Sequence, residues 1–164
     1  MRMRRLIWIP APIASDIMSE ADRWFDLETG GLFMGYWANE TEVVVTAHIE
    51  AGPNARRERN RFEPDLGWQQ ERIDEQYARS RRLDQYLGDW HTHPRATTAH
   101  LSHTDRACAR RIISTPSARQ GHPVMMLLVG EPGSWQMAPF ICALGRSWGL
   151  FPSVREESAE VRLY

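Results

Sequence analysis

The chain has 164 residues, of which 42% are hydrophobic and 25% are charged. This length and composition exclude a disordered chain and favour one domain that buries its core without disulfides or structural metals. The formal net charge of -1 excludes the global basic field that attracts nucleic acid or an anionic membrane. We therefore expect neither nucleic acid nor membrane as a partner.

The cysteine content and the N-terminal segment indicate a cytoplasmic protein. Cys108 and Cys142 are too few for the disulfide framework of a secreted domain, and they lack the C-x-x-C spacing of a metal knuckle. The apolar run over residues 6–9 is short and is broken by Pro10 and Pro12, which argues against a secretory signal. No stretch approaches the roughly 20 apolar residues that span a bilayer.

The first part of the chain predicts a strand, a helix and a pair of strands. Residues 5–9 suit a strand, and residues 15–25 carry apolar side chains at helical spacing. The sequence Glu28-Thr-Gly-Gly31 is a tight connector into a strand over residues 32–37. Residues 41–49, rich in β-branched side chains, predict the next strand.

Residues 52–65 predict a loop or flap, because they begin with Gly-Pro-Asn and contain few apolar side chains. The segment carries four arginines, Arg56, Arg57, Arg59 and Arg61. Two interpretations are open for them. They form an ordinary solvated surface, or their guanidinium groups meet carboxylates of a partner protein.

The second part of the chain predicts alternating helices and strands. The expected elements are a helix over 66–80, a strand over 85–90 that enters His91-Thr-His-Pro94, a helix from Ser102 to about 113, and strands over 124–129 and 135–144. This order predicts a single α/β domain over residues 1–145, with a central sheet flanked by helices. We expect residues 146–164 to form a C-terminal tail that packs on this domain or is extended.

Two histidines are placed to meet on one face of a strand. His91 and His93 are two residues apart, and side chains of a strand alternate between its faces, so both rings project from the same face while Thr92 points the other way. Pro94 then ends the strand, because proline cannot donate to the sheet. An H-x-H pair alone is weak evidence for a metal site.

Ser102-His-Thr-Asp105 has two interpretations. It matches the capping box, in which a serine hydroxyl caps a helix and an acidic side chain of the first turn bonds back. Alternatively, Asp105 joins His91 and His93 as the third ligand of a catalytic zinc site, which takes three protein ligands and leaves the fourth position for water. The combination of both motifs favours the zinc site.

These motifs resemble those of the JAMM (JAB/MPN) metallopeptidases, whose pattern is a distant glutamate, then H-[ST]-H-P, then S-x-x-D. The matching glutamate is Glu28, and the resemblance extends from about Glu28 to Phe140. It implies the cytidine-deaminase-like fold of that family and a Zn²⁺ held by His91, His93 and Asp105. It also implies that Glu28 is the catalytic base and that Ser102 stabilises the oxyanion.

Three further segments resemble the bacterial branch of this family, which is associated with ubiquitin-like conjugation and phage-defence operons. They are residues 52–55, 62–65 and 86–94. This likeness implies a ubiquitin-like modifier and its conjugates as partners, together with the cognate activating and conjugating enzymes. Eleven residues separate His93 from Asp105, one more than in the eukaryotic members, so we expect a longer loop there.

The resemblance implies a zinc isopeptidase that cleaves after the C-terminus of a ubiquitin-like modifier. Two other functions are compatible with the residues. One is a catalytically silent MPN scaffold that binds partners, which would need none of the site residues. The other is a metal-dependent hydrolase acting on a different bond, such as a phosphoester, although no glycine-rich phosphate loop accompanies the motifs.

Overall fold

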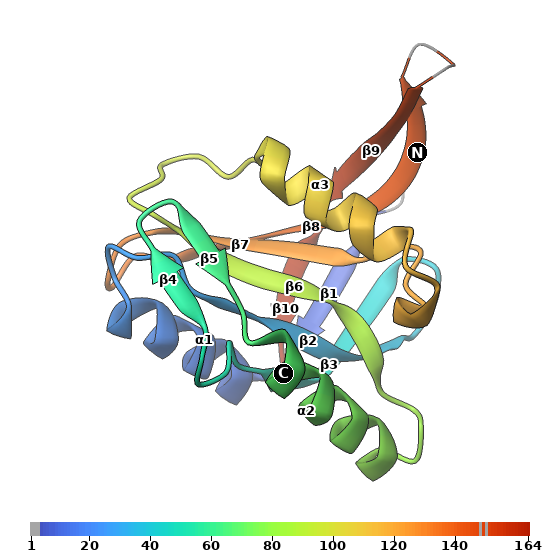
Figure 1. Cartoon of the computed structure of the whole chain (residues 1–164), viewed down its shortest axis with the longest axis horizontal. Coiled ribbons are helices and arrows are strands. Elements are labelled where there is room, and N and C mark those ends of the chain that lie inside the picture. Colours follow the sequence, from blue (N-terminus) through green and yellow to red (C-terminus); the bar gives the residue numbers. More distant parts are fainter. Residues whose placement is uncertain (1–3, 148, 150) are drawn as a thin grey trace.

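The computed structural model describes residues 4–147, 149 and 151–164, and Figure 1 shows them as a curled sheet with helices on both faces. The elements in chain order are β1 (Leu6–Ile9), α1 (Ala11–Arg23), β2 (Gly30–Trp37), β3 (Glu42–Ile49), β4 (Arg56–Glu58), β5 (Arg61–Glu63), α2 (Leu66–Arg79), β6 (Gln85–Pro94), α3 (His103–Ile113), the short 3-10 helix η1 (Pro116–Ala118), β7 (Val124–Gly130), β8 (Gln136–Ser147), β9 (Phe151–Ser158) and β10 (Glu160–Leu163).

Eight of the strands form one mixed sheet in the order β10-β1-β3-β2-β6-β7-β8-β9, and β4 pairs with β5 in a separate hairpin. The pairs β1–β10, β1–β3 and β6–β7 are parallel, and the remaining pairs are antiparallel. The predicted α/β fold with a central mixed sheet flanked by helices is therefore confirmed.

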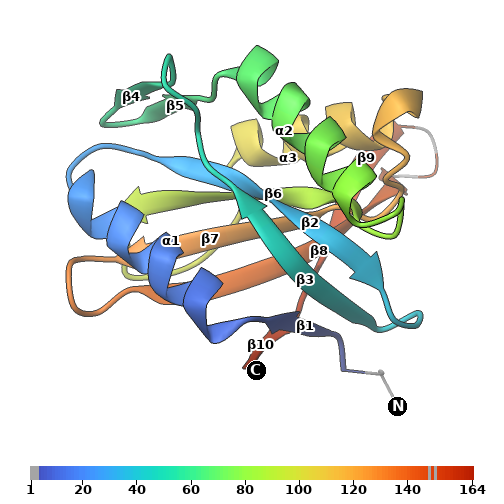
Figure 2. The same ribbon diagram turned by 90° about the horizontal axis from the view of Figure 1, so that it is seen from below.

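The two faces of the sheet bury different side chains because residues alternate along each strand. Along β7, Val124, Met126 and Leu128 pack in the core beneath α1, whereas Met125 and Leu127 pack in the core beneath α3. A third cluster lies against α2 and contains Leu32, Met34 and Ile49 with Trp68 and Ile73 packed on it. As Figure 2 illustrates, α1 covers one face of the sheet, while α2 and α3 lie on the other.

Two local predictions differ from the structure. Helix α1 begins at Ala11 rather than at residue 15, because Pro12 occupies its first turn, where a missing N–H costs no helical hydrogen bond. The segment expected to be a loop or flap contains the β4–β5 hairpin, in which three residues of each strand pair with one another. We keep the name flap for residues 52–65.

Residues near the C-terminus add strands to both ends of the sheet. Strand β9 pairs with β8 along eight residue pairs, and β10 pairs with β1 in parallel. The Tyr164 hydroxyl also donates to the Val45 carbonyl at 2.9 Å, which fastens the end of the chain to β3. Among the described residues, no helix is both long and apolar enough to cross a membrane.

Candidate metal centre

Strand β6 directs His91 and His93 to the face of the sheet that α3 covers. Their Nε2 atoms are 3.0 Å apart, and the ring centroids are separated by 4.8 Å. Thr92 points the other way and is buried, where it bonds to Thr29. The predicted alternation along this strand is confirmed, so two imidazole nitrogens meet at one point.

Asp105, in the first turn of α3, completes a cluster of three side chains that could hold a metal ion. Its Oδ1 lies 3.0 Å from His91 Nε2, and its Oδ2 lies 3.7 Å from His93 Nε2. Ligand atoms on a tetrahedral zinc ion are about 3.3 Å apart, given metal–ligand bonds of about 2.0–2.1 Å. The observed separations fit such an ion, and the nitrogen and carboxylate donors suit it chemically.

The same carboxylate also caps α3. Asp105 Oδ2 accepts the Ser102 backbone N–H at 2.7 Å, and the Asp105 N–H donates to Ser102 Oγ at 3.1 Å. This is the capping box that the sequence predicted. The two interpretations of the motif are compatible, because the cap fixes the rotamer that aims the carboxylate at the histidines.

The pKa shifts of Asp105 and His93 favour the forms that bind a metal ion. Burial opposes ionisation of Asp105, but His91 and the hydrogen bonds from Ser102 outweigh it and hold the pKa of the carboxyl well below its usual range. Burial and the neighbouring His91 lower the pKa of His93, although Asp105 opposes this shift. An ionised carboxylate and a neutral imidazole are the forms that bind metal.

Glu28 lies in the connector between α1 and β2, next to this cluster. Burial raises the pKa of its carboxyl, while the nearby His91 lowers that pKa and Asp105 raises it further. Glu28 is two residues before Gly30, which pairs with His91 across the β2–β6 ladder, and the His91 and Asp105 charges act on its carboxyl. It remains outside the group of side chains whose donor atoms meet, which is the position that a general base requires.

The Gly30–Gly31 pair lets this connector approach strand β6. Gly30 pairs with His91 across the β2–β6 ladder. A Cβ atom on Gly30 would lie 2.3 Å from the Trp90 carbonyl oxygen and 2.8 Å from Phe62 Cε1 of the flap. Contacts this short do not occur in real structures, so only glycine allows the two strands and the flap to meet here.

Asp89 is a neighbour of the site that the sequence analysis missed. It precedes His91 by two residues, accepts the Tyr86 hydroxyl at 2.8 Å, and interacts electrostatically with His91. Because side chains alternate along β6, Asp89 lies on the same face as His91 and His93, and this pattern could have indicated it from the sequence. Cys108 lies 3.9 Å from the same carboxylate, and Trp90 is buried in the core.

Two other histidines lie close to the candidate ligands in the sequence. His100 and His103 are exposed, and neither belongs to the group of converging donor atoms. His100 nevertheless interacts electrostatically with His93. The three converging protein donors therefore leave a tetrahedral ion one position for water or substrate.

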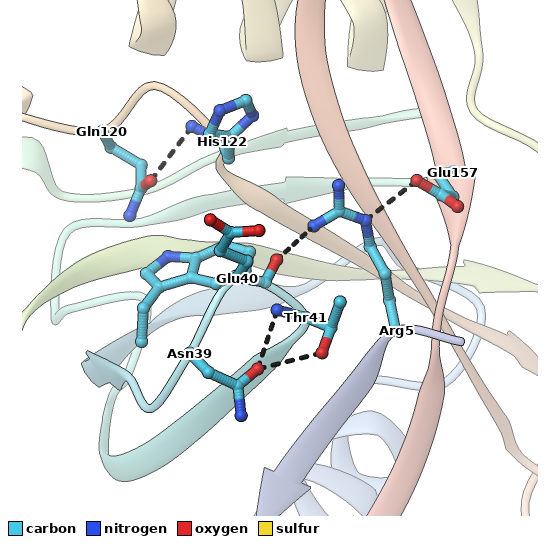
Figure 3. A pocket seen from close by; sticks show the side chains of 8 residues that line it. Arg5, Asn39, Glu40, Thr41, Gln120, His122 and Glu157 are labelled. Atoms are coloured by element: carbon cyan, nitrogen blue, oxygen red, sulfur yellow. Dashed lines mark hydrogen bonds and ion pairs between the residues drawn. The ribbon is translucent and has the colours of Figure 1, made fainter. Parts of the chain in front are cut away.

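A cavity of about 890 Å³ lies at the other end of β2, away from all five candidate residues. Trp37 is among its lining residues, and Figure 3 shows Arg5 and His122, which also line it. The Arg5 guanidinium donates to Glu157 Oε2 at 2.8 Å and to the Glu40 carbonyl at 3.0 Å. Its charge is therefore already engaged within the protein.

Comparisons with known proteins agree with this geometry. Residues 10–140 match the family described as prokaryotic homologs of the JAB domain. The chain is 46% identical over 162 residues to the "Probable metalloprotease y4qB" of Sinorhizobium fredii, covering 99% of both chains. It is 32% identical to the "CD-NTase/cGAS isopeptidase" of Vibrio cholerae over 108 residues, which are 66% of this chain and 65% of that protein.

The fold is also similar to that of a solved structure. Protein DSY2949 from Desulfitobacterium hafniense aligns with a TM-score of 0.65 over 97% of this chain and 92% of that one, at 17% sequence identity. Such a likeness shows the fold alone. Together with the matched family, it agrees with the resemblance to JAMM metallopeptidases seen in the motifs, and the chain belongs to the prokaryotic JAB-domain family.

Proposed function

We propose that the protein is a zinc-dependent isopeptidase that cleaves the peptide or isopeptide bond after the C-terminus of a ubiquitin-like modifier. His91, His93 and Asp105 hold the metal, Glu28 is the general base, and Ser102 stabilises the oxyanion. The observation that carries the proposal is the convergence of two imidazole nitrogens and the two oxygens of the Asp105 carboxylate, at separations of 3.0 to 3.7 Å. The His91 and Asp105 charges act on the Glu28 carboxyl.

Zinc supplies Lewis-acid chemistry when bound, because it polarises a carbonyl and lowers the pKa of water towards about 7. Glu28 accepts the proton of the attacking water and transfers it to the nitrogen of the leaving amine. The raised pKa of the Glu28 carboxyl suits this role, since a base that later donates its proton works best near the operating pH.

Hydrogen bonds with Asp105 hold Ser102 at the start of α3. Ser102 Oγ accepts the Asp105 N–H at 3.1 Å, and an accepting hydroxyl still has its own O–H to donate. We infer that this O–H points to the oxygen of the scissile carbonyl and stabilises the negative charge that develops there. The capping role holds Ser102 in place while the donor acts.

The substrate class rests on the relatives. Two proteins that are 32% and 29% identical to this chain over 66% of its length, from Vibrio cholerae and Escherichia coli, are described as CD-NTase/cGAS isopeptidases. Their names support a conjugate as the substrate. We infer that the protein acts in bacterial antiviral defence, in the cytoplasm, beside activating and conjugating enzymes. The 46% identical relative, a probable metalloprotease, supports the peptidase chemistry.

The decisive test is cleavage of a panel of ubiquitin-like proteins fused at their C-termini to a reporter, by the zinc-loaded protein. We expect cleavage after the modifier by the unaltered protein and a loss of about 10²–10⁴-fold with Glu28→Gln, which retains its zinc. Glu58→Gln is the matched control, since Glu58 is exposed on the flap. If zinc binds but no fusion is cut, a partner-binding scaffold or another hydrolase replaces the proposal.

A further inference from the structure

Arg57 is the arginine of the flap that points into the molecule. Only 12% of its side chain is exposed, whereas Arg56, Arg59 and Arg61 are exposed. The alternation along β4 explains the difference, because Arg57 faces the opposite side from Arg56 and Glu58. A guanidinium that is largely shielded from water needs partners within the protein, and the partners of Arg57 indicate its role.

Three contacts engage the Arg57 guanidinium. Its Nε donates to Thr29 Oγ1 at 2.9 Å, and its Nη2 forms an ion pair with Glu20 Oε1 at 3.2 Å. Its Cζ lies 4.2 Å from the centre of the Trp24 ring, a cation–π contact. The Thr29 hydroxyl itself donates to Glu20 Oε1 at 3.1 Å, so the three polar groups form a closed set of bonds.

The connector that carries Glu28 and Thr29 is bonded to the flap on one side and to β6 on the other. The Glu28 N–H donates to the carbonyl of Glu58, the residue after Arg57, at 2.8 Å. The Thr29 N–H donates to Thr92 Oγ1 at 3.0 Å, and the Thr92 N–H donates to the Thr29 carbonyl at 2.8 Å. Thr92 stands between His91 and His93.

A continuous path of contacts therefore joins α1 to the metal-binding strand. It runs from Glu20 through Arg57 to Thr29, and from Thr29 to Thr92 between the two histidines. Glu28 is held within this path by its own backbone bond to the flap. In both views of the molecule, the β4–β5 hairpin lies at the end of the sheet where β6 ends (Figures 1 and 2).

We propose that Arg57 is a positioning residue that fixes the Glu28 connector and the flap against the metal-binding strand. This inference rests on the proposed function, in which Glu28 is the base. A base must be held within a fraction of an ångström of its productive place, and a displacement of about 1 Å can lower a rate about a hundredfold. Arg57 supplies this restraint without contacting the reacting atoms.

The first experiment measures hydrogen exchange of backbone amides in the zinc-loaded full chain. Arg57→Ala should speed exchange of the Glu28 and Thr29 amides about tenfold or more, because the flap and the connector lose the contacts that hold them together. Amides within β7 should exchange at the unaltered rate. Arg56→Ala is the matched control, since it removes the same charge from the same strand at an exposed position. Unchanged exchange at Glu28 and Thr29 in Arg57→Ala overturns the proposal.

The second experiment separates kcat from KM on a fusion that the unaltered protein cuts. Arg57→Ala should lower kcat about tenfold to a hundredfold and change KM less than about threefold, with zinc content unchanged. Adding Glu20→Ala to Arg57→Ala should lower kcat little further, because both side chains act through one network. An unchanged kcat, or loss of zinc from Arg57→Ala, contradicts a positioning role.

The two proposals fail separately. If the unaltered protein cuts no fusion, the proposed function is wrong, and the exchange rates alone decide whether Arg57 holds the connector. If the unaltered protein cuts a fusion and Arg57→Ala matches Arg56→Ala in both exchange and kcat, only the inference about Arg57 is wrong.

Discussion

Asp105 lies with one carboxylate oxygen 3.0 Å from His91 Nε2, while its other oxygen accepts the Ser102 N–H at 2.7 Å. A single side chain thus joins helix α3 to strand β6 and caps the helix that carries it. The contact with His91 is part of the candidate metal centre, whereas the hydrogen bond from Ser102 stabilises the start of helix α3. Substitutions can separate the two contributions.

Asp105→Ala should abolish zinc binding and also destabilise the zinc-free protein by about 1 kcal/mol, because α3 loses part of its cap. His91→Ala should abolish zinc binding while leaving the cap in place. Zinc content and urea unfolding of the zinc-free proteins measure the two effects. Thr104→Ala, at an exposed position of the same turn, is the control. Equal stability of the Asp105→Ala and unaltered zinc-free proteins would contradict the double role.

Ser102→Ala should lower kcat about 10²–10³-fold while zinc remains bound, since it removes the hydroxyl that we assign to the oxyanion. It should also cost about 1 kcal/mol of stability, because the same oxygen accepts the Asp105 N–H. Ser102→Thr retains a hydroxyl and should recover much of the stability. A Ser102→Ala protein with normal kcat but lower stability would leave Ser102 as a cap alone.

Gly30→Ala should destabilise the protein by roughly 1–3 kcal/mol and weaken zinc binding. The new Cβ would lie 2.3 Å from the Trp90 carbonyl and 3.0 Å from His91 Cβ, so β6 must shift where it carries a ligand. Thermal unfolding and zinc affinity check this. Gly121→Ala is the control, because a Cβ there meets nothing within 4 Å. Full zinc affinity in Gly30→Ala would show that the strand tolerates the shift.

Zinc affinity should depend little on His93 between pH 8 and pH 7. Burial and the nearby His91 lower the pKa of His93, so its ring stays neutral and able to bind metal until the pH falls below the ordinary histidine range. Protons then compete with zinc, and the affinity declines. Competition with a chelator from pH 8 to pH 5 measures this. A tenfold weakening already between pH 8 and pH 7 would contradict the lowered pKa.

A chain that ends at Gly145 should be less stable than the full chain. The shortened protein loses β9 and β10, which leaves β1 without its parallel partner and removes the Arg106–Glu156 ion pair and the Tyr164–Val45 hydrogen bond. Buried strand edges need paired backbone groups. Thermal unfolding measures the difference, and an unchanged Tm would place the domain boundary at residue 145, as the sequence suggested.

The sequence alone determined the parts of the site that are local. His91 and His93 share a face because strand side chains alternate, and Ser102 and Asp105 form a capping box because helix starts need acceptors for free N–H groups. The α/β order of elements followed from hydrophobic periodicity. Each of these relationships spans a few residues, so the pattern of side chains suffices to predict it.

Only the tertiary structure decided the relationships between distant segments. Sequence spacing could not bring Glu28 to the metal centre, pair Arg57 with Glu20 across 37 positions, or join β10 to β1. The flap arginines look alike in the sequence, but packing buries one and leaves its neighbours in solvent. Such contacts bring together segments that are far apart in the chain, and they depend on the order of the strands and the packing of the helices. Burial of the whole hydrophobic core decides that arrangement, and no local pattern of residues does.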